Sequence, residues 1–550
     1  MGVLVGSPAG VGGVPERLRN WTLRRADWRF LLPTPRPRRS VCYAPGLLAR
    51  AVEMISESTV DPGTNPVAIC DLAVAVDPAP ATLHAAWVAL GPGGCCYSEW
   101  YGAIPGRQQR VHRLLESAGF GAVACYWAWP WPSRTPARFW VPLQAPGGLE
   151  YFAGSRPEPR NALRRLGSSI VRFAWRLSTR LGLAVPICAV ARKQGSQTSL
   201  ATPATPNCQL QVRAARGVEP WFFDMIRDGW SDWELGPRPD RLSWLLLTGG
   251  QRAISKIVGL VFAEPDSRPH LAVKMPRVSE SRDMLRKEAA ILRAVHQLRS
   301  GGVPGVPRVL FFDARADGAI LGETALPGIP LLNLLRRSNY RDFAWKGTRW
   351  LSELAGRPQP SPRTTWWDRL VERALGDFVS SFGAIVDTGM LRETSQALAS
   401  LGDLALVCEQ RDFSPWNVLV SPDDQLVVLD WESTELQGLP GLDLLYFLTY
   451  LAFFLEDANP PTGRLRESYR KMLDPSTFTG GISAECVAHY ADHVGIDRGE
   501  FRSLRLLLWM LHSRSEYSHF TADTGGPPGR DKLRDSVFVQ LWEQEVRYGR

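Results

Sequence analysis

Residues 409–417 read EQRDFSPWN, and the Asp with an Asn five positions later decides the fold that we predict for this chain. Catalytic loops for phosphoryl transfer use this spacing, because the Asp accepts the proton of the attacking hydroxyl and the Asn holds a magnesium ion. Ordinary surface turns also carry Asp and Asn at this spacing. The prediction therefore depends on the residues that follow.

A hairpin is predicted directly after this loop. Residues 418–429 read VLVSPDDQLVVL, which is two apolar runs around a turn-forming centre. Because a hairpin brings its two ends together, Asn417 at its entry and Asp430 at its exit should lie side by side. Two oxygen ligands at one end of a ribbon suit a hard cation that carries nucleotide phosphates. The pattern indicates Asp412 as a catalytic residue and Asn417 and Asp430 as magnesium ligands.

The composition is that of an ordinary globular protein with several domains. The chain has 550 residues, of which 45% are hydrophobic and 22% charged. Its formal net charge of +9 is spread along the chain without clusters, so we expect no nucleic-acid interface. The nine cysteines show neither metal-ligand spacing nor a disulfide framework, which favours reduced thiols and a cytoplasmic location.

No segment reads as a membrane anchor. The N-terminus lacks the basic region and continuous apolar core of a signal peptide. The longest apolar run, residues 442–455, contains Asp443 and is too short to span a bilayer. We expect a buried helix there and no stable membrane insertion.

Residues 242–262 predict two strands joined by a glycine turn. The turn reads TGGQR at 248–252, where the chain doubles back tightly and can present its amides to anionic oxygens. A Gly-Gly hairpin is common and is weak evidence when it stands alone. Together with the motifs below, it makes Thr248, Gly249 and Gly250 nucleotide-binding candidates.

A lysine and a glutamate follow in the pattern of a kinase ion pair. Residues 270–275 read HLAVKM, an apolar strand in which Lys274 matches the lysine that contacts α- and β-phosphates. The predicted helix 279–299 carries Glu288 inside its apolar stripe. A carboxylate on a buried face needs a partner to offset its desolvation, and Lys274 is the candidate. The alternative is a solvated Glu288 at the rim of the helix.

Two further strands, 309–313 and 319–324, complete this lobe. The second runs into ETALPG at 323–328, which we interpret as a hinge. The backbone of three residues would meet adenine there: Glu323, Thr324 and Ala325.

Residues 21–150 predict an α/β domain. The almost wholly apolar segment 67–76 (VAICDLAVAV) is expected to be a parallel strand covered on both faces. Other elements alternate around it: strand 41–43, helix 47–55, helix 83–90, strand 95–98, helix 111–117 and strand 122–127.

This order, with LHAAWVALGPGGCCYSEW at 83–100 and LLESAGFGAVACYWAWP at 114–130, resembles the second half of a class I S-adenosylmethionine-dependent methyltransferase domain. In that family a glycine-rich turn after the first strand closely approaches the cofactor. The matching residues 43–46 read YAPG, with one glycine and a proline, and no acidic ribose ligand is evident. We therefore predict a degenerate, non-catalytic domain, with S-adenosylmethionine binding as the alternative.

Beyond residue 330 the chain is predicted to be helical, and residues 242 to about 520 resemble the aminoglycoside phosphotransferase/choline kinase family of protein-kinase-like enzymes. The resemblance is carried by the following residues and motifs: Lys274, Glu288, ETALPGIPL, RDFSPWNVLV, VLDWE and GLPGLDLLYFL. It implies ATP and Mg²⁺ as cofactors and a small-molecule hydroxyl as acceptor. It also implies a role for each of five residues: Asp412 as base, Asn417 and Asp430 on the metal, and Lys274 on the phosphates, held by Glu288.

The catalytic loop departs from the family at two positions. Gln410 and Arg411 stand where the family usually has His-Gly. The His mainly braces the loop, so Gln can replace it, whereas Arg in place of Gly could alter the loop backbone. Asp443 either braces this loop from a helix start or simply caps that helix.

The chemical class of the phosphate acceptor is predicted from the short segment that follows Asp430. Few residues separate Asp430 from the turn LPG at 439–441, which leaves no room for the activation segment of a protein kinase. We therefore expect a small-molecule kinase for a sugar, aminoglycoside or amino alcohol. Glu432 and Glu435 either pair with a cationic acceptor or lie in a solvated turn.

Two other functions stay open at this point. One is a pseudokinase/methyltransferase-like scaffold that binds nucleotide or a partner without catalysis. The other is a bifunctional methyltransferase-kinase of a glycan or natural-product pathway.

The predicted fold class is α/β plus α+β, with an N-terminal Rossmann-like methyltransferase-type domain followed by a two-lobed protein-kinase-like domain. The predicted segments are a disordered leader (1–20), the methyltransferase-like domain (21–150), a helical connector and linker (151–240), the kinase-like N-lobe (241–330) and the helical C-lobe (331–550).

Overall fold

The structure is a computed structural model, and it describes residues 16–63, 69–102, 106–154, 186–194, 218–250, 252–299, 301–315, 318–458, 464–524 and 526–548. The chain divides into two compact units. The sheet unit comprises Arg17–Leu285 and Val309–Ala325. The helical unit comprises Met1–Glu16, Arg286–Arg308 and Leu326–Arg550.

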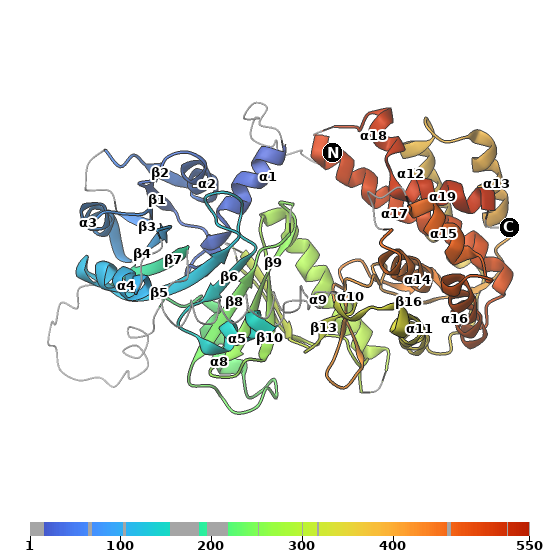
Figure 1. The fold of residues 1–550 in the computed structure, drawn as a ribbon, viewed down its shortest axis with the longest axis horizontal. Helices are drawn as coiled ribbons and strands as arrows, with labels where there is room; N and C mark the ends of the chain where they lie inside the picture. The colour runs from blue at the N-terminus through green and yellow to red at the C-terminus, as the bar shows by residue number, and fades with distance from the viewer. Residues whose placement is uncertain are drawn as a thin grey trace, which may run out of the picture. The chain divides into compact units, whose positions relative to one another are not determined.

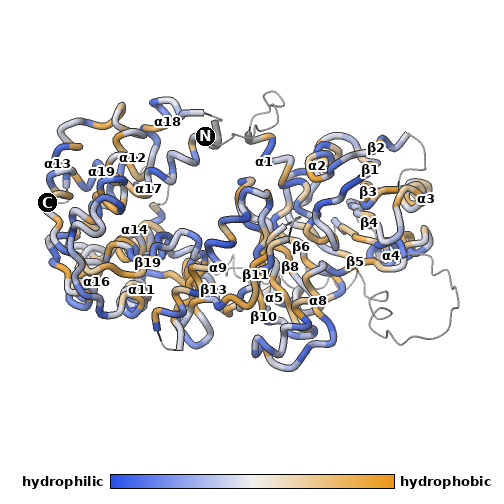
Figure 2. Tube along the Cα trace, turned by 180° about the vertical axis from the view of Figure 1, so that it is seen from behind, coloured by the Kyte–Doolittle hydropathy of each residue, from blue (hydrophilic) through white to orange (hydrophobic). Residues whose placement is uncertain are grey.

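The sheet unit is built on one mixed sheet. In the described residues its twelve strands follow the order β11-β12-β10-β9-β8-β6-β5-β7-β4-β3-β1-β2 (Figure 1). These strands carry buried hydrophobic residues such as Val74, Val190 and Leu246, and Figure 2 shows the hydropathy of each described residue along the chain. The strands are β1 Arg39–Cys42, β2 Ser58–Val60, β3 Cys70–Val76, β4 Leu90–Trp100, β5 Phe120–Trp129, β6 Phe139–Pro142, β7 Ile187–Lys193, β8 Leu242–Leu247, β9 Lys256–Ala263, β10 Pro269–Pro276, β11 Val309–Arg315 and β12 Gly318–Thr324.

The N-terminal part of this sheet has α/β character. Strands β2, β1, β3 and β4 are mutually parallel, as crossover connections require, and helices α2 (Leu47–Ile55) and α3 (Pro80–Ala89) lie on the crossovers. Strand β7 then lies antiparallel between β4 and β5. The predicted covered strand is confirmed in β3, whose central residues are buried. Helix α4 (Arg107–Ser117) also lies where a helix was predicted.

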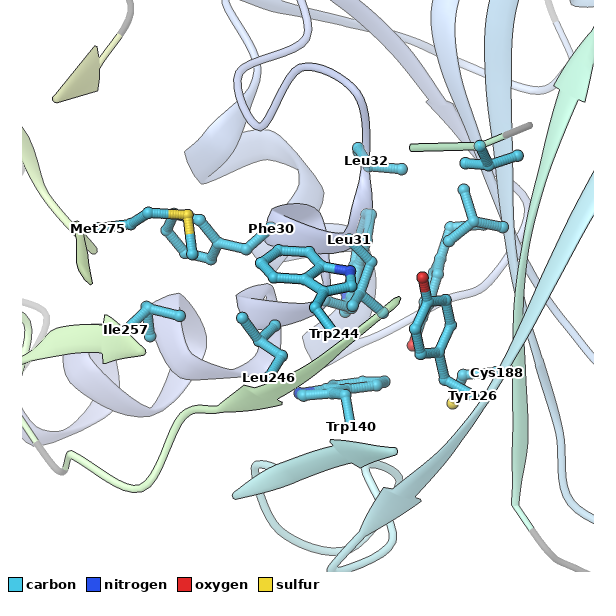
Figure 3. Close-up of a cluster of buried hydrophobic side chains, with 14 of the residues drawn as sticks. Phe30, Leu31, Leu32, Tyr126, Trp140, Cys188, Trp244, Leu246, Ile257 and Met275 are labelled. Atoms are coloured by element: carbon cyan, nitrogen blue, oxygen red, sulfur yellow. The ribbon is translucent and has the colours of Figure 1, made fainter. Parts of the chain in front are cut away.

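The sheet continues without a break into the predicted kinase-like N-lobe (241–330). Strand β6 pairs antiparallel with β8, with Phe139 opposite Leu247 and Trp140 opposite Leu246. One hydrophobic core crosses this joint and includes Phe30, Trp140 and Trp244 (Figure 3). The predicted limits at residues 150 and 240 therefore fall inside one compact unit, while the domain assignment itself stays a prediction.

Several sequence-based expectations need correction. Residues 16–20 of the predicted disordered leader begin helix α1 (Glu16–Arg25), which is followed by the buried 3₁₀ helix η1 (Asp27–Leu31). The turn GPGG at 91–94 is part of β4 rather than a break before it. Residues 155–185 and 195–217 of the predicted helical connector and linker (151–240) lie outside the described residues. Several elements had no prediction, among them β2, β6, β7, α5 (Pro146–Gly154) and α8 (Phe222–Gly229).

The kinase-like strands form as predicted. Strands β8 and β9 flank the glycine turn, β10 carries Lys274, and β11 pairs with β12. Helix α9 (Arg282–Gln297) follows the 3₁₀ turn η2 (Ser279–Ser281) inside the predicted helix 279–299.

The helical unit surrounds a small three-stranded sheet of β13 (Ile329–Pro330), β17 (Val418–Val420) and β18 (Leu426–Val428). Strands β17 and β18 form the predicted hairpin. Its helices are α10 Leu331–Leu334, α11 Tyr340–Ala355, α12 Arg373–Phe382, α13 Thr388–Ala399, α14 Leu442–Leu455, α15 Leu465–Leu473, α16 Phe478–Val494, α17 Phe501–Thr524, α18 Arg530–Arg534 and α19 Val537–Tyr548.

Helix α14 spans the apolar run 442–455 and is buried along most of its length, as predicted. None of the helices in the described parts of the chain has the length and apolar character needed to cross a membrane. The first helix of the part that was predicted to be helical, α10, ends at Leu334.

Candidate active site

The loop between β16 (Val407–Glu409) and β17 is held by the side chain of Gln410. Its Nε2 donates to the carbonyl oxygens of Leu429 (3.1 Å) and Asp430 (2.6 Å). Its Oε1 accepts from the backbone amide of Asp412 at 2.8 Å. Gln410 thus joins the loop to the exit of the hairpin, the bracing role that we expected it to take over from His.

Arg411 keeps the loop conformation that a glycine would favour. Its φ is +67°, which costs an L-residue about 1 kcal/mol or more. The carboxylate of Asp443, in the first turn of α14, accepts the amides of Gln410 (2.6 Å) and Arg411 (2.8 Å). These two bonds support Asp443 as the brace of the loop. The Arg411 side chain pairs with buried Glu409, Nε to Oε2, at 3.3 Å.

Asp412 and Asn417 are in direct contact. Asn417 Nδ2 donates to Asp412 Oδ2 at 2.8 Å and to the Asp412 carbonyl at 3.1 Å. The amide of Leu429 donates to the Asn417 carbonyl at 2.9 Å, so Asp430 is next to a residue that pairs with Asn417 across the hairpin. Burial raises the pKa of Asp412 to about 7, and the negative charge of Asp430 adds to the rise. The hairpin ends therefore bring three predicted site residues together.

The chemistry of this donor set fits magnesium. Asn417 uses its amide nitrogen toward Asp412, which leaves the oxygen Oδ1 for a metal ion. The charges of Asp430 and Glu432 both disfavour ionisation of Asp412, and a cation would relieve this repulsion. Among the described residues, no three His, Cys, Asp or Glu side chains form a metal-binding group. A metal here would thus take only part of its ligands from the protein, as magnesium does when phosphates and water supply the rest.

An aromatic cluster next to Asp412 was missed by the sequence analysis. The charge of Asp412 contributes to raised pKa values at Tyr446 and Tyr450, for which burial is the main cause. Trp416, which is 41% exposed, packs edge-on against Tyr450 with ring centroids 5.0 Å apart. His512 stacks on Tyr446 at 4.1 Å. Tyr446 and Tyr450 are four residues apart on α14, and this helical spacing was the available signal.

The nucleotide-binding candidates of the sheet unit lie around β10. Lys274 Nζ is 2.8 Å from Glu323 Oε1, and both side chains are buried. Glu288 on α9 is fully buried, which argues against a solvated rim position. Its predicted pairing with Lys274 stays a prediction, as does the contact of the backbone at Glu323, Thr324 and Ala325 with adenine.

The glycine turn is anchored at its first residue. Thr248 is buried, its hydroxyl donates to the Ala137 carbonyl at 2.6 Å, and its amide donates to the Arg138 carbonyl at 2.8 Å. The hydroxyl and the backbone amide of Thr248 therefore both donate hydrogen bonds within the protein. Gly249 is exposed, whereas a Cβ on Gly250 would collide with the Ser255 side chain, so the turn needs glycine at that position.

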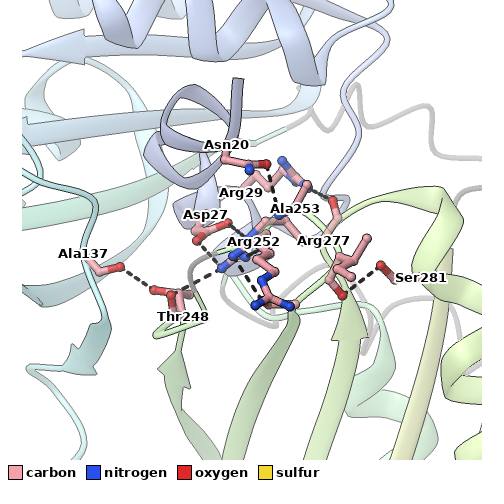
Figure 4. Close-up of polar contacts among 11 residues, drawn as sticks. Asn20, Asp27, Arg29, Ala137, Thr248, Arg252, Ala253, Arg277 and Ser281 are labelled. Atoms are coloured by element: carbon pink, nitrogen blue, oxygen red, sulfur yellow. Dashed lines mark hydrogen bonds and ion pairs between the residues drawn. The ribbon is translucent and has the colours of Figure 1, made fainter. Parts of the chain in front are cut away.

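The buried ion pair of Asp27 and Arg277 holds the same turn through hydrogen bonds to the backbone of the turn. Arg277 donates from Nε and Nη2 to the two carboxylate oxygens of Asp27, at 2.9 and 3.0 Å (Figure 4). It also donates to the carbonyls of Thr248 (3.3 Å) and Arg252, on either side of the glycines. Asp27 belongs to η1, so the N-terminal segment holds the glycine turn in place.

Comparison with known proteins gives one family match, which covers part of the chain. Residues 244–472 match the sequence model described as the phosphotransferase enzyme family, so the C-terminal half carries a phosphotransferase-family domain. This match supports the protein-kinase-like fold there and does not cover the N-terminal part of the chain. A search of curated proteins found no match.

Solved structures were also found. A complex of gentamicin with APH(2")-IIa has 14% sequence identity and a TM-score of 0.33, and covers 60% of this chain and 99% of that one. Choline kinase LicA from Streptococcus pneumoniae has 14% identity and a TM-score of 0.33, over 53% and 90% of the two chains. An aminoglycoside phosphotransferase from Alicyclobacillus acidocaldarius has 16% identity and a TM-score of 0.30, over 54% and 90%.

Proposed function

We propose that this protein transfers the γ-phosphoryl group of ATP to a hydroxyl of a small molecule in a magnesium-dependent reaction. The observation that carries the proposal is the arrangement of Asp412, Asn417 and Asp430 at the hairpin ends, braced by Gln410 and Asp443. The phosphotransferase-family match over the same segment supports it.

Each residue has a role that its position favours. Asp412 orients the acceptor hydroxyl and accepts its proton while the oxygen bonds to the γ-phosphorus and the bond to the ADP oxygen breaks. Asn417 Oδ1 and the Asp430 carboxylate would hold Mg²⁺, which neutralises charge on the β- and γ-phosphates. Lys274 contacts the α- and β-phosphates, and its ion pair with Glu323 fixes the position of its ammonium group.

The acceptor is a small alcohol such as a sugar, an aminoglycoside or an amino alcohol. Only residues 431–441 separate Asp430 from α14, which is too short for a peptide platform. Glu435 pairs with Arg369 at 3.0 Å, so its charge is already balanced. Glu432, whose charge acts on Asp412, is the candidate that we propose for an acceptor ammonium.

The experiment is a transfer assay with labelled ATP and a panel of aminoglycosides, amino alcohols and sugars. Asp412→Asn should lower kcat by about 10²–10⁴-fold, the usual worth of a positioned proton acceptor. Asp423→Asn, on the exposed hairpin turn, is the matched control and should keep full activity. Full transfer activity in folded Asp412→Asn would refute the proposed role.

We propose a non-catalytic, structural role for the N-terminal methyltransferase-like part. Glu99, near the end of β4, accepts two bonds of 2.7 Å from Arg25 and one of 2.8 Å from Tyr97. Its carboxylate is thus occupied by the protein at the strand end where parallel sheets usually bind ligands. Specific binding of labelled S-adenosylmethionine by the full chain would instead favour the bifunctional enzyme.

A nucleotide-binding scaffold without catalysis is the remaining alternative. It is favoured by Arg411 at a left-handed position where the family usually has glycine. Two measurements together distinguish the phosphotransferase from the scaffold: thermal unfolding with and without millimolar Mg-ATP, and the transfer assay. A thermal shift without transfer to any acceptor indicates a binding scaffold.

A further inference from the structure

Arg411 occupies a backbone position that glycine would adopt more easily. Its φ of +67° lies in the left-handed region, which residues with a Cβ avoid and glycine enters freely. The residue directly precedes Asp412, the proposed base. An arginine at this position therefore has a conformational cost, and the contacts of its side chain must offset that cost.

The guanidinium of Arg411 pairs with a carboxylate inside the helical unit. Its Nε donates to Glu409 Oε2 at 3.3 Å. The Glu409 side chain is 4% exposed and that of Arg411 is 31% exposed, so a half-buried arginine meets a buried acid. A buried carboxylate without a partner is strongly unfavourable, and an ion pair offsets part of its desolvation.

Glu409 has two acidic neighbours. Glu435 lies opposite it in the pairing of β16 with β19 (Glu435–Gly438), and like charges in such a pair repel each other. Asp443 is the second neighbour. Burial raises the pKa of Asp443, and the negative charge of Glu409 adds to the rise. These three carboxylates therefore need positive charge beside them.

Two arginines supply this charge. Arg369 pairs with Glu435, Nη1 to Oε2, at 3.0 Å. Arg411 acts on the other two acids, because its charge lowers the pKa of both Glu409 and Asp443 against the effect of burial. Arg411 is thus the counter-charge shared by Glu409 and Asp443.

Asp443 connects this group of charges to the loop. Its carboxylate accepts the backbone amides of Gln410 at 2.6 Å and of Arg411 at 2.8 Å, the two residues before Asp412. An ionised carboxylate accepts such bonds more strongly than a protonated one, which gives up part of its acceptor capacity. By favouring the ionised form of Asp443, Arg411 strengthens the bonds that hold the loop.

We propose that Arg411 is a positioning residue: its guanidinium balances the charges of Glu409 and Asp443, so that the loop keeps Asp412 in place for phosphoryl transfer. This inference rests on the proposed function. It makes the arginine a requirement of this site rather than a sign of lost activity. Glycine would relieve the backbone but would leave two buried acids without their counter-charge, and the second effect is the larger.

The test is Arg411→Gly, for which relief of strain and loss of charge predict opposite results. We expect this variant to lower Tm and to lower kcat at least tenfold. The KM for ATP should change less than twofold, because Asp412 orients the acceptor rather than the nucleotide. Arg357→Gly, at an exposed loop position of the same unit, is the matched control and should behave like the parent protein. A rise of Tm and kcat in Arg411→Gly would overturn the proposal.

Two further variants separate the charge of Arg411 from its shape. Arg411→Lys keeps a positive charge and should have a kcat at least fivefold above that of Arg411→Gly. Glu409→Gln combined with Arg411→Gly removes the buried acid together with its partner, so its kcat and Tm should also exceed those of Arg411→Gly, as expected for coupled residues. Values no higher than those of Arg411→Gly in both variants would refute the role of charge.

The Tm measurements need no turnover, so they distinguish failure of this inference from failure of the proposed function. If the parent protein transfers phosphate to no acceptor, the phosphotransferase proposal fails. A lower Tm in Arg411→Gly and its recovery in the double variant would then still support the charge balance at the loop. An active parent protein with an unchanged kcat in Arg411→Gly would refute the positioning role alone.

Discussion

Gln410 holds the loop between β16 and β17 through both ends of its side-chain amide. Three hydrogen bonds join it to Asp412, Leu429 and Asp430. Because Nε2 and Oε1 are both used, the amide acts as donor toward the hairpin exit and as acceptor toward the backbone amide of Asp412. One side chain thus sets the distance between the proposed base and the proposed metal ligand.

We predict that Gln410→Ala lowers kcat while changing the KM for ATP little. Each lost bond is worth roughly 1 kcal/mol, and the loop that orients Asp412 loses all three. We expect kcat to fall at least tenfold, which corresponds to about 1.4 kcal/mol. Gln425→Ala, on the exposed hairpin turn, is the control for loss of an amide side chain. An unchanged kcat in Gln410→Ala would show that the loop holds its shape without these bonds.

His512 makes the stability of the protein depend on pH. Burial lowers its pKa from 6.5 to about 3, and the positive charge of Arg411 adds to the effect. In the unfolded chain the ring binds a proton below about pH 6.5. The unfolded state therefore binds more protons between pH 6.5 and 3. The contribution of neutral His512 is complete above pH 6.5 and is lost as the pH falls through this range.

We predict that His512→Phe reduces this dependence. Phenylalanine keeps a ring against Tyr446 and has no group that titrates. Thermal unfolding between pH 8 and 5 should give a shallower fall of Tm below pH 6.5 in the variant than in the parent protein. His489→Phe, at an exposed position of α16, should keep the parental slope. Equal slopes for His512→Phe and the parent would contradict the assignment.

At the scale of elements, the ion pair of Asp27 and Arg277 connects the helix η1 to the glycine turn. Both side chains are buried, and Arg277 also donates to backbone carbonyls at both ends of the turn. Removal of one member of a buried pair leaves an uncompensated charge and lowers the free energy of unfolding by about 3–5 kcal/mol. Removal of both charges together should lower the free energy of unfolding by less than the two single removals added together.

We predict that Asp27→Asn lowers Tm and weakens Mg-ATP binding, because Arg277 no longer fixes the turn between Thr248 and Arg252. Arg277→Met should have a similar effect. The double variant should lose less than the sum of the two single losses, as coupled residues do. Asp232→Asn, at an exposed position of the same unit, is the control. Additive losses in the double variant would show that the pair does not act as one unit.

Elements with a local signal were predictable, and contacts between distant segments were not. Helix α14 and the hairpin of β17 and β18 follow from continuous apolar runs and turn residues, and the structure has them where the pattern indicated. Asp27 and Arg277 are 250 residues apart, and neither shows in the sequence that it needs the other. The bracing by Gln410 was expected only because the family has His at this position. Its three hydrogen-bond partners could be identified only from the structure.

At the scale of the whole molecule, the N-terminal α/β part and the strands that carry Lys274 share one sheet. The joint consists of β6 and β8, whose pairing brings Trp140 opposite Leu246. The strand β8 would be a sheet edge without this partner, with unpaired backbone groups. The N-terminal part therefore completes the sheet that carries Lys274, which is the structural role that we propose for it.

The last prediction tests this joint. Trp140 is 1% exposed and lies in the shared core with Trp244, while Trp129 on the neighbouring strand is 43% exposed. Trp140→Ala should destabilise the sheet unit by about 3–5 kcal/mol, as large core truncations do. Because β8 leads into the glycine turn, Mg-ATP binding should weaken together with the fall in Tm. Trp129→Ala is the matched control and should change neither quantity much. If Trp140→Ala lowers Tm but leaves Mg-ATP affinity at the parental value, the nucleotide lobe is energetically independent of the N-terminal part, and its structural role must be abandoned.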